Sequence, residues 1–235
     1  MSVDRASFVR EQYATPENLR ARKSAYENAE GDDPRQWAFE AVAAAKPERV
    51  LEVGGGEGEL AERLIKELGV KLVGIDQSAA MVGVQRSKGI DARVGDVQAL
   101  PFADGEFDVA LAAWMLYHVA DLNGGLAQLA RVLRPGGVLI AVTNGLDHLQ
   151  ELWDLAARAT DIGEFNFRSE NGEEVLRRHF ASVERREAVG SVTMDDETIR
   201  RFGASWDALG SLVEIPPVGR PVSVRRHSTV FVARK

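Results

Sequence analysis

The stretch Val50-Leu51-Glu52-Val53-Gly54-Gly55-Gly56-Glu57-Gly58-Glu59-Leu60 decides the fold of this chain. Its first four residues predict a short buried strand, and the glycines after them predict a tight loop that opens a helix. Glycine allows positive φ and lets a ligand approach the backbone, and the start of a helix presents unpaired N–H donors. Glu52 lies at the carboxyl end of the strand, and we expect its side chain to face the ligand.

The glycines alone leave three interpretations of the loop. The run Gly56-Glu57-Gly58-Glu59-Leu60-Ala61 fits the dinucleotide pattern G-x-G-x-x-G/A, and Asp76 follows at a suitable distance for a ribose hydroxyl. The carboxylates of Glu52, Glu57 and Glu59, however, would oppose a pyrophosphate. They suit S-adenosylmethionine, which carries an ammonium, a sulfonium and a ribose but no phosphate. A glycine-rich turn without a ligand is the third interpretation.

Composition and charge narrow the class of protein. The 235 residues are enough for one large domain or a domain with a cap. No apolar run is long enough to span a membrane and no signal peptide is evident, so we expect a cytoplasmic location and no membrane partner. The lack of cysteine excludes disulfides and thiolate chemistry. The net charge of -7 disfavours nucleic acid as a partner, and no His, Asp or Glu spacing suggests a metal site.

Strands and helices alternate along the middle of the chain. We expect strands at 49–53, 71–75, 91–94, 107–113 and 138–142, with helices at 59–68, 78–87 and 122–132. This alternation predicts βαβ units and a parallel sheet with ligands at the carboxyl ends of its strands. Further strands at 183–192 and 222–233 complete the expected α/β fold: a Rossmann-like, doubly wound, mostly parallel seven-stranded sheet with an antiparallel C-terminal strand.

Six segments occur in a characteristic order and spacing. They are Glu52-Val53-Gly54-Gly55-Gly56-Glu57-Gly58, Val73-Gly74-Ile75-Asp76-Gln77-Ser78, Gly95-Asp96-Val97-Gln98-Ala99-Leu100-Pro101-Phe102, Phe107-Asp108-Val109-Ala110-Leu111-Ala112, Leu116-Tyr117-His118-Val119 and Leu133-Arg134-Pro135-Gly136-Gly137. Together they resemble the class I S-adenosylmethionine-dependent methyltransferases, in particular the type 11 group, over residues 48–142. In one departure, Gly55 and Glu57 stand where many members have Cys or Thr. The alternate glycines remain.

The resemblance implies S-adenosylmethionine as the cofactor and assigns contacts to its adenosine. Asp76 is expected to accept both ribose hydroxyls, and Gln77 and Met81 to lie near the ribose and adenine. Asp96 is expected to accept the adenine amino group, while the Val97 N–H meets a ring nitrogen. Both aspartates have an alternative role, which is to cap the helix or turn that follows them.

The resemblance also assigns residues to the methionine end of the cofactor. The loop glycines Gly54, Gly56 and Gly58 are expected to pass close to it, with Ala113 beneath it. Glu52 is either an anchor behind the loop or a partner of the ammonium. Tyr13 is expected to close over the cofactor from the N-terminal helices, with a place in the core as an equal alternative.

The sequence and the resemblance together predict two domains. Residues 1–46 form an N-terminal helical cap or lid, with Thr15 as an N-cap before Pro16. Residues 47–235 form the methyltransferase domain. Within it, 144–180 is the expected substrate cover, and its aromatic residues predict a mostly apolar pocket for a small molecule. Those aromatic residues are Trp153, Phe165 and Phe167.

The resemblance implies transfer of a methyl group by in-line displacement to a small-molecule acceptor, for example a secondary metabolite. The acceptor atom stays open among O, N, C and S. His118 is the candidate general base, because an imidazole titrates near neutrality; it can instead orient the substrate, and Tyr117 beside it can serve either way. The alternatives are an RNA-nucleoside methyltransferase and a catalytically silent S-adenosylmethionine-binding protein, with a nicotinamide oxidoreductase last. The oligomeric state stays open.

Overall fold

The computed structural model of the chain describes residues 9, 11–156, 166–205 and 215–235. The strands are β1 (Ala29–Gly31), β2 (Arg49–Val53), β3 (Lys71–Asp76), β4 (Asp91–Val94), β5 (Phe107–Ala113), β6 (Leu133–Asn144), β7 (Ser182–Met194) and β8 (Val222–Arg234). The helices are α2 (Glu17–Ser24), α3 (Pro34–Ala44), α4 (Glu59–Leu68), α5 (Ala79–Ser87), α6 (Leu122–Val132), α7 (Gln150–Asp154), α8 (Gly172–Arg177) and α9 (Asp196–Ala204). Short 3₁₀ turns lie at Val97–Ala99 and Leu116–His118.

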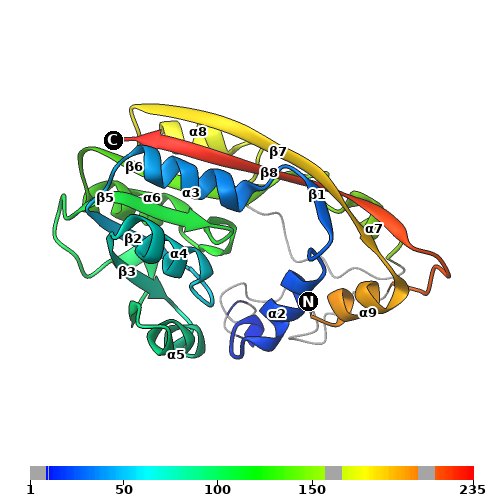
Figure 1. The fold of residues 1–235 in the computed structure, drawn as a ribbon. Helices are drawn as coiled ribbons and strands as arrows, with labels where there is room; N and C mark the ends of the chain where they lie inside the picture. Colours follow the sequence, from blue (N-terminus) through cyan, green and yellow to red (C-terminus); the bar gives the residue numbers. More distant parts are fainter. Residues whose placement is uncertain (1–8, 10, 157–165, 206–214) are drawn as a thin grey trace.

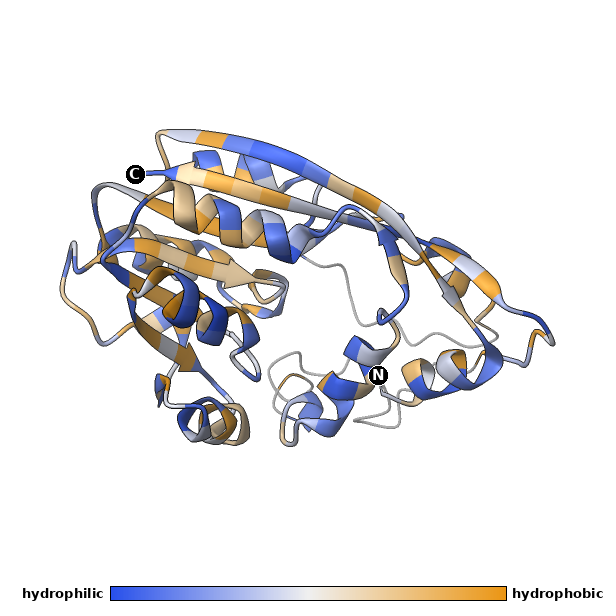
Figure 2. Cartoon of the chain, viewed as in Figure 1, coloured by the Kyte–Doolittle hydropathy of each residue, from blue (hydrophilic) through white to orange (hydrophobic). Residues whose placement is uncertain are grey.

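The strands of the described residues form one eight-stranded sheet in the order β1-β7-β8-β6-β5-β2-β3-β4 (Figure 1). The pairs from β6 to β4 are parallel; β8 then pairs antiparallel with β6, and β7 pairs antiparallel with β8. The expected Rossmann-like α/β fold is thereby confirmed. The central strands are buried on both faces, which explains their almost uninterrupted apolar sequences, and Figure 2 shows them mainly in the hydrophobic colours.

The expected count of seven strands is wrong by one. The additional strand, β1, lies in the region expected to be only helical and pairs antiparallel with β7, from Ala29 opposite Val192 to Gly31 opposite Gly190. A side chain at position 190 would place its Cβ 2.1 Å from the Glu30 carbonyl oxygen, so glycine is required for this close pairing. Three residues of low β-propensity carry no local strand signal, and only β7 makes them a strand.

Side chains cap the starts of α3 and α5. Asp33 caps α3, with Pro34 as its first residue, and Ser78 caps α5 by accepting the Met81 N–H. The prediction that Thr15 is an N-cap is wrong. Helix α2 begins at Glu17, and Pro16 occupies its N-cap position without a side-chain hydrogen bond.

Helices cover both faces of the sheet. One hydrophobic cluster joins α6 and α8 to the sheet, and a second joins α3, α4 and α5 to the opposite face. Phe167, expected in a substrate pocket, is fully buried in the first cluster against Phe231, so that expectation is wrong for Phe167. Phe165 lies outside the described residues.

Beyond this core, β7 and β8 continue as a two-stranded ribbon. β6 pairs with β8 only over Ser228–Arg234, whereas β7 and β8 stay paired as far as Met194 opposite Val222. Figure 1 shows α7 and α9 beside the far ends of these strands. A third cluster, which includes Leu152 of α7 and Phe202 of α9, packs there. We call α7, α9, residues 25–29 and the far ends of β7 and β8 the extension lobe.

None of the described helices is long and apolar enough to cross a membrane.

Candidate active site

The glycine loop after β2 has the backbone that its sequence predicts. Gly54, Gly56 and Gly58 all adopt positive φ, at 64°, 57° and 73°. A Cβ at Gly54 would lie 2.7 Å from the Met115 side chain, and one at Gly56 would lie 2.9 Å from Leu19. The alternate glycines are therefore needed for both backbone conformation and close packing.

Glu52 is buried beneath this loop. Glu52 is only 3% exposed, and its Oε2 atom has no hydrogen-bond partner among the described residues. A Cβ at Gly55 would lie 2.1 Å from that oxygen, so the carboxyl group fills the space under the loop. Burial, assisted by the charge of nearby Asp76, raises the pKa of Glu52 to about 8. A buried acid without a partner is a place where a cation would be stabilised.

Asp76 ends β3 and holds the loop in place. Its Oδ2 accepts the Gly56 N–H at 3.2 Å and its Oδ1 accepts the Ser78 N–H at 2.9 Å. Burial raises the pKa of Asp76 in spite of these two hydrogen bonds. Each carboxylate oxygen keeps a second acceptor site, so the structural role leaves capacity for ligand hydroxyls.

The other residues expected around the adenosine differ in their contacts and in their exposure. Asp96 caps the 3₁₀ turn through the Gln98 N–H at 2.9 Å, which matches its alternative role. Val97 and Met81 are buried, whereas Gln77 is exposed. All four follow β3 or β4, so they share the loop's edge of the sheet.

The segment before α2 folds onto the same edge. The Tyr13 hydroxyl lies 3.1 Å from His118 Nε2, and the Tyr13 carbonyl oxygen accepts the Ser78 hydroxyl at 2.6 Å. The Tyr117 and His118 rings lie 4.5 Å apart, just beyond Ala113 at the end of β5. Tyr13, Tyr117 and His118 are thus brought together from segments about 100 residues apart, which sequence spacing alone cannot show.

Ion pairs tie α2 to the glycine loop. Glu57 accepts from Arg20 at 2.7 Å and from Lys23 at 3.2 Å, and Glu59 pairs with Lys23 and Arg35. Burial acts to raise the pKa of Glu57, but the hydrogen bonds from Arg20 and Lys23 outweigh it and hold the pKa low. The sequence suggested that the charges of Glu57 and Glu59 are unbalanced, but in the structure both are paired with cations. Glu52 and Asp76 are instead acidic groups whose pKa is raised by burial.

One group of possible metal ligands was missed in the sequence. Asp147, Glu170 and His227 come from three separate segments and offer ligand atoms within 4.8 Å of one another. Asp147 already pairs with Arg225 at 2.8 Å and with His227 Nδ1 at 2.5 Å. A metal ion would have to displace the guanidinium of Arg225 from Asp147.

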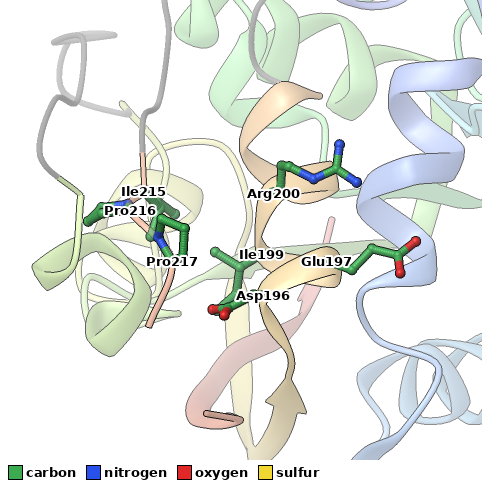
Figure 3. A pocket seen from close by; sticks show the side chains of 7 residues that line it. All are labelled: Asp196, Glu197, Ile199, Arg200, Ile215, Pro216 and Pro217. Carbon is green, nitrogen blue, oxygen red and sulfur yellow. The ribbon is translucent and has the colours of Figure 1, made fainter. Parts of the chain in front are cut away.

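A surface pocket of about 370 Å³ lies in the extension lobe (Figure 3). Ile199 and Arg200 of α9 line it together with Ile215 and the two prolines that follow. Asp196, also at its edge, is occupied by the N–H groups of Val218 and Gly219. The pocket shares no residue with the glycine loop or its neighbours.

Comparison with known proteins agrees with this geometry. Residues 51–141 match a family model described as a methyltransferase domain. This region of the chain is thus similar to methyltransferases of the type 11 group. The matched region runs from within β2 to within β6 and includes Glu52, Asp76, Asp96 and His118.

Curated relatives resemble part of the chain. It is 38% identical over 108 residues to a demethylmenaquinone methyltransferase of Renibacterium salmoninarum, covering 45% of either chain. It is 40% identical over 115 residues to a 2-phytyl-1,4-naphthoquinone methyltransferase of Synechococcus elongatus, covering 43% of this chain and 49% of that protein. The matched part of the chain therefore spans less than half the length of these relatives.

Solved structures resemble the chain over more of its length but with low identity. The phosphoethanolamine N-methyltransferase 2 of Haemonchus contortus, solved with S-adenosylhomocysteine, has a TM-score of 0.65 at 16% identity, covering 99% of this chain and 60% of that one. The [4+2]-cyclase SpnF has a TM-score of 0.57 at 21% identity, covering 86% and 79%. A methyltransferase and a cyclase on one fold illustrate that the fold alone does not determine the reaction.

The cofactor implied by the methyltransferase domain is S-adenosylmethionine, and the residues present fit it. Glu52 and Asp76 provide buried carboxyl groups beside the loop, which suit an ammonium and ribose hydroxyls. Arg20 and Lys23, the cations nearest to the loop in the pairs described above, are already bonded to glutamates. A pyrophosphate would meet carboxylates here instead of free cations.

Proposed function

We propose that this protein transfers the methyl group of S-adenosylmethionine to a small-molecule acceptor. The observation that carries the proposal is the buried Glu52 carboxyl group beneath the glycine loop, whose Oε2 lacks a partner in the described part of the chain. A cationic ligand beside Glu52 would stabilise its ionised form. In the proposed complex Asp76 accepts the ribose hydroxyls, and Gly54, Gly56, Gly58 and Ala113 border the methionine end.

The remaining residues expected to contact the cofactor have the same roles in this proposal. Asp96 and the Val97 N–H meet the adenine, and Gln77 and Met81 border the ribose side. Tyr13 closes over them, because its carbonyl oxygen is bonded to Ser78 beside Asp76. Residues 1–46 then act as a lid, held by the ion pairs of α2, and part of 144–180 borders the acceptor.

S-adenosylmethionine supplies an activated methyl group, so the protein mainly aligns an acceptor atom with it and excludes water. His118 follows β5 at the site and lies near both Tyr13 and Tyr117. We propose that it takes the acceptor's proton where one must leave. Tyr117 packs beside it and orients the acceptor.

The names of the relatives do not identify the acceptor of this chain. They are named for quinone substrates, but they match less than half of this chain, and the family match ends at residue 141, before the extension lobe. The net charge of -7 favours a small molecule over RNA.

Calorimetry with S-adenosylhomocysteine tests the cofactor assignment. Asp76→Asn keeps the shape but removes the charge, and we expect about tenfold or greater loss of affinity, because hydrogen bonds to charged groups contribute about 1.5–3 kcal/mol. Asp91→Asn, at an exposed aspartate paired with Arg93, is the control and should bind normally. Absence of binding in the parent, or unchanged affinity in Asp76→Asn, would overturn the proposal.

Turnover with isotope-labelled S-adenosylmethionine and a panel of small molecules, quinols and RNA separates catalysis from binding. His118→Gln should lower turnover about a hundredfold while leaving cofactor affinity nearly unchanged. Binding without turnover on any acceptor would favour the catalytically silent alternative, and methylation of RNA alone would favour the nucleoside enzyme.

A further inference from the structure

The buried face of α5 carries one polar side chain. The buried residues of this helix are Met81, Val82 and Gln85, which share one helical face by their i, i+1 and i+4 spacing. Gln85 is only 1% exposed. Because burying an amide group is costly unless it is hydrogen-bonded, a glutamine on this face needs a partner.

That partner is the glycine loop after β2. Gln85 Nε2 donates to the Gly56 carbonyl oxygen at 2.7 Å. A carbonyl oxygen only accepts hydrogen bonds, so the amide group must turn its N–H toward the loop and its own oxygen away. The Oε1 atom has no hydrogen-bond partner among the described residues. The bond to Gly56 is therefore the contact that compensates for burying this amide.

Two glycines leave room for the Gln85 side chain. A Cβ at Gly58 would lie 2.9 Å from Gln85 Cγ, and a Cβ at Gly74 of β3 would lie 2.5 Å from Gln85 Oε1. The side chain is thus enclosed between the loop and β3. Moving its amide away from the Gly56 oxygen would require one of these two segments to move as well.

The backbone of Gly56 is held from both sides. Asp76 Oδ2 accepts its N–H at 3.2 Å, and Gln85 donates to its carbonyl oxygen. Its φ of 57° is permitted by glycine but not enforced, because glycine populates both signs of φ about equally. The side chains of Asp76 and Gln85 therefore select this conformation of the loop. In the proposed complex Asp76 also accepts the ribose hydroxyls, whereas Gln85 acts on the loop alone.

We propose that Gln85 is a positioning residue for the cofactor, because its amide fixes the glycine loop in the binding conformation before S-adenosylmethionine arrives. The proposal rests on the proposed function, since it concerns the loop of that same site. Gln85 acts through Gly56 and does not itself touch the ligand. A loop that is already ordered loses less conformational entropy on binding, so this hydrogen bond raises the affinity for the cofactor.

Calorimetry with S-adenosylhomocysteine tests the proposal. Gln85→Met has a side chain of similar length without an N–H donor, and it should bind about fivefold more weakly than the parent, because the loop loses one hydrogen bond. Val82→Ala leaves a cavity on the same face of α5 and is the control, which should lower stability in urea but leave the affinity unchanged. Equal affinity of Gln85→Met and the parent would overturn the proposal.

Gln85→Glu separates hydrogen bonding from packing. An ionised carboxylate cannot donate to the Gly56 oxygen, whereas the protonated acid can. The affinity of this variant relative to the parent should therefore be low at about pH 8 and recover toward one as the pH falls to about 5, since burial raises the pKa of a carboxyl group. The parent is measured at each pH, because the acids beside the loop, Glu52, Glu57 and Asp76, are present in both proteins.

Gln85→Met provides the reference for this pH series. Its affinity relative to the parent should not change with pH, because it has no group to protonate at position 85. A ratio for Gln85→Glu that is independent of pH would overturn the proposal, and it would do so even if Gln85→Met failed to fold.

Hydrogen exchange of the ligand-free protein keeps the two proposals apart. Amide exchange in residues 54–58 should be about fivefold faster in Gln85→Met than in the parent, whether or not a cofactor binds. If the parent binds no S-adenosylhomocysteine but this difference is present, the proposed function fails and Gln85 still orders the loop. If S-adenosylhomocysteine binds equally to Gln85→Met and the parent, only the role of Gln85 fails.

Discussion

At the scale of single residues, burial changes what the acidic side chains can do. Glu52 and Glu57 flank the same loop, but Glu57 receives two cationic donors and Glu52 Oε2 receives none from the described residues. The pKa values of the two therefore move in opposite directions. The sequence shows two similar glutamates; the difference arises from what packs around each.

Glu52 makes the stability of the protein depend on pH. A carboxyl group whose pKa rises from its ordinary value to about 8 on folding destabilises the folded state as pH rises between these two values. Relative to Glu52→Gln, the parent should lose on the order of 3 kcal/mol of unfolding free energy between pH 5 and pH 8. Urea unfolding at several pH values measures this, and parallel stability curves of parent and variant would contradict it.

At the scale of elements, α2 is attached to the rest of the molecule mainly through polar contacts. It has no buried residue of its own, and Arg20 and Lys23 attach it to the loop through Glu57 and Glu59. An amphipathic stripe would have predicted a permanently packed helix. Its absence is consistent with the proposed role of residues 1–46 as a lid.

Removing the shared acid should loosen α2. In Glu57→Gln both ion pairs to that residue weaken, and we expect amide exchange within Glu17–Ser24 to accelerate about fivefold, since partly exposed pairs contribute about 1 kcal/mol together. Mass-spectrometric hydrogen exchange measures the rate, and high salt should have a similar effect on the parent. Glu67→Gln, at the exposed i,i+4 partner of Arg63, is the control. Equal exchange in all three proteins would contradict a lid held by charge.

At the scale of the whole molecule, the extension lobe has a hydrophobic cluster separate from the two that sandwich the sheet. Among the strands and helices of the described residues, β7 and β8 alone run continuously through both regions. The cluster of the lobe contains no residue of the region that matches the methyltransferase family.

A cavity in the lobe should test this separation. Phe202 is fully buried, and Phe202→Ala should cost about 3–5 kcal/mol locally. We expect faster amide exchange in residues 189–194 and 222–227, with unchanged exchange in β2 and β5. Equal acceleration in both regions would mean that lobe and sheet unfold as one unit.

The sequence alone predicted where β2 to β6 lie along the chain, because strands follow local periodicity. It also predicted the glycine loop and the aspartates that end or follow strands, because these depend on local turn chemistry and capping. It did not reveal β1, the burial of Phe167 or the pairing of Glu57 with α2, since these depend on what lies opposite in space. Only the tertiary structure placed Tyr13 beside His118 and Tyr26 beside His148. Contacts between residues about 100 positions apart leave no periodic trace in one sequence, whereas the strand and loop that hold the cofactor edge are encoded within ten neighbouring residues.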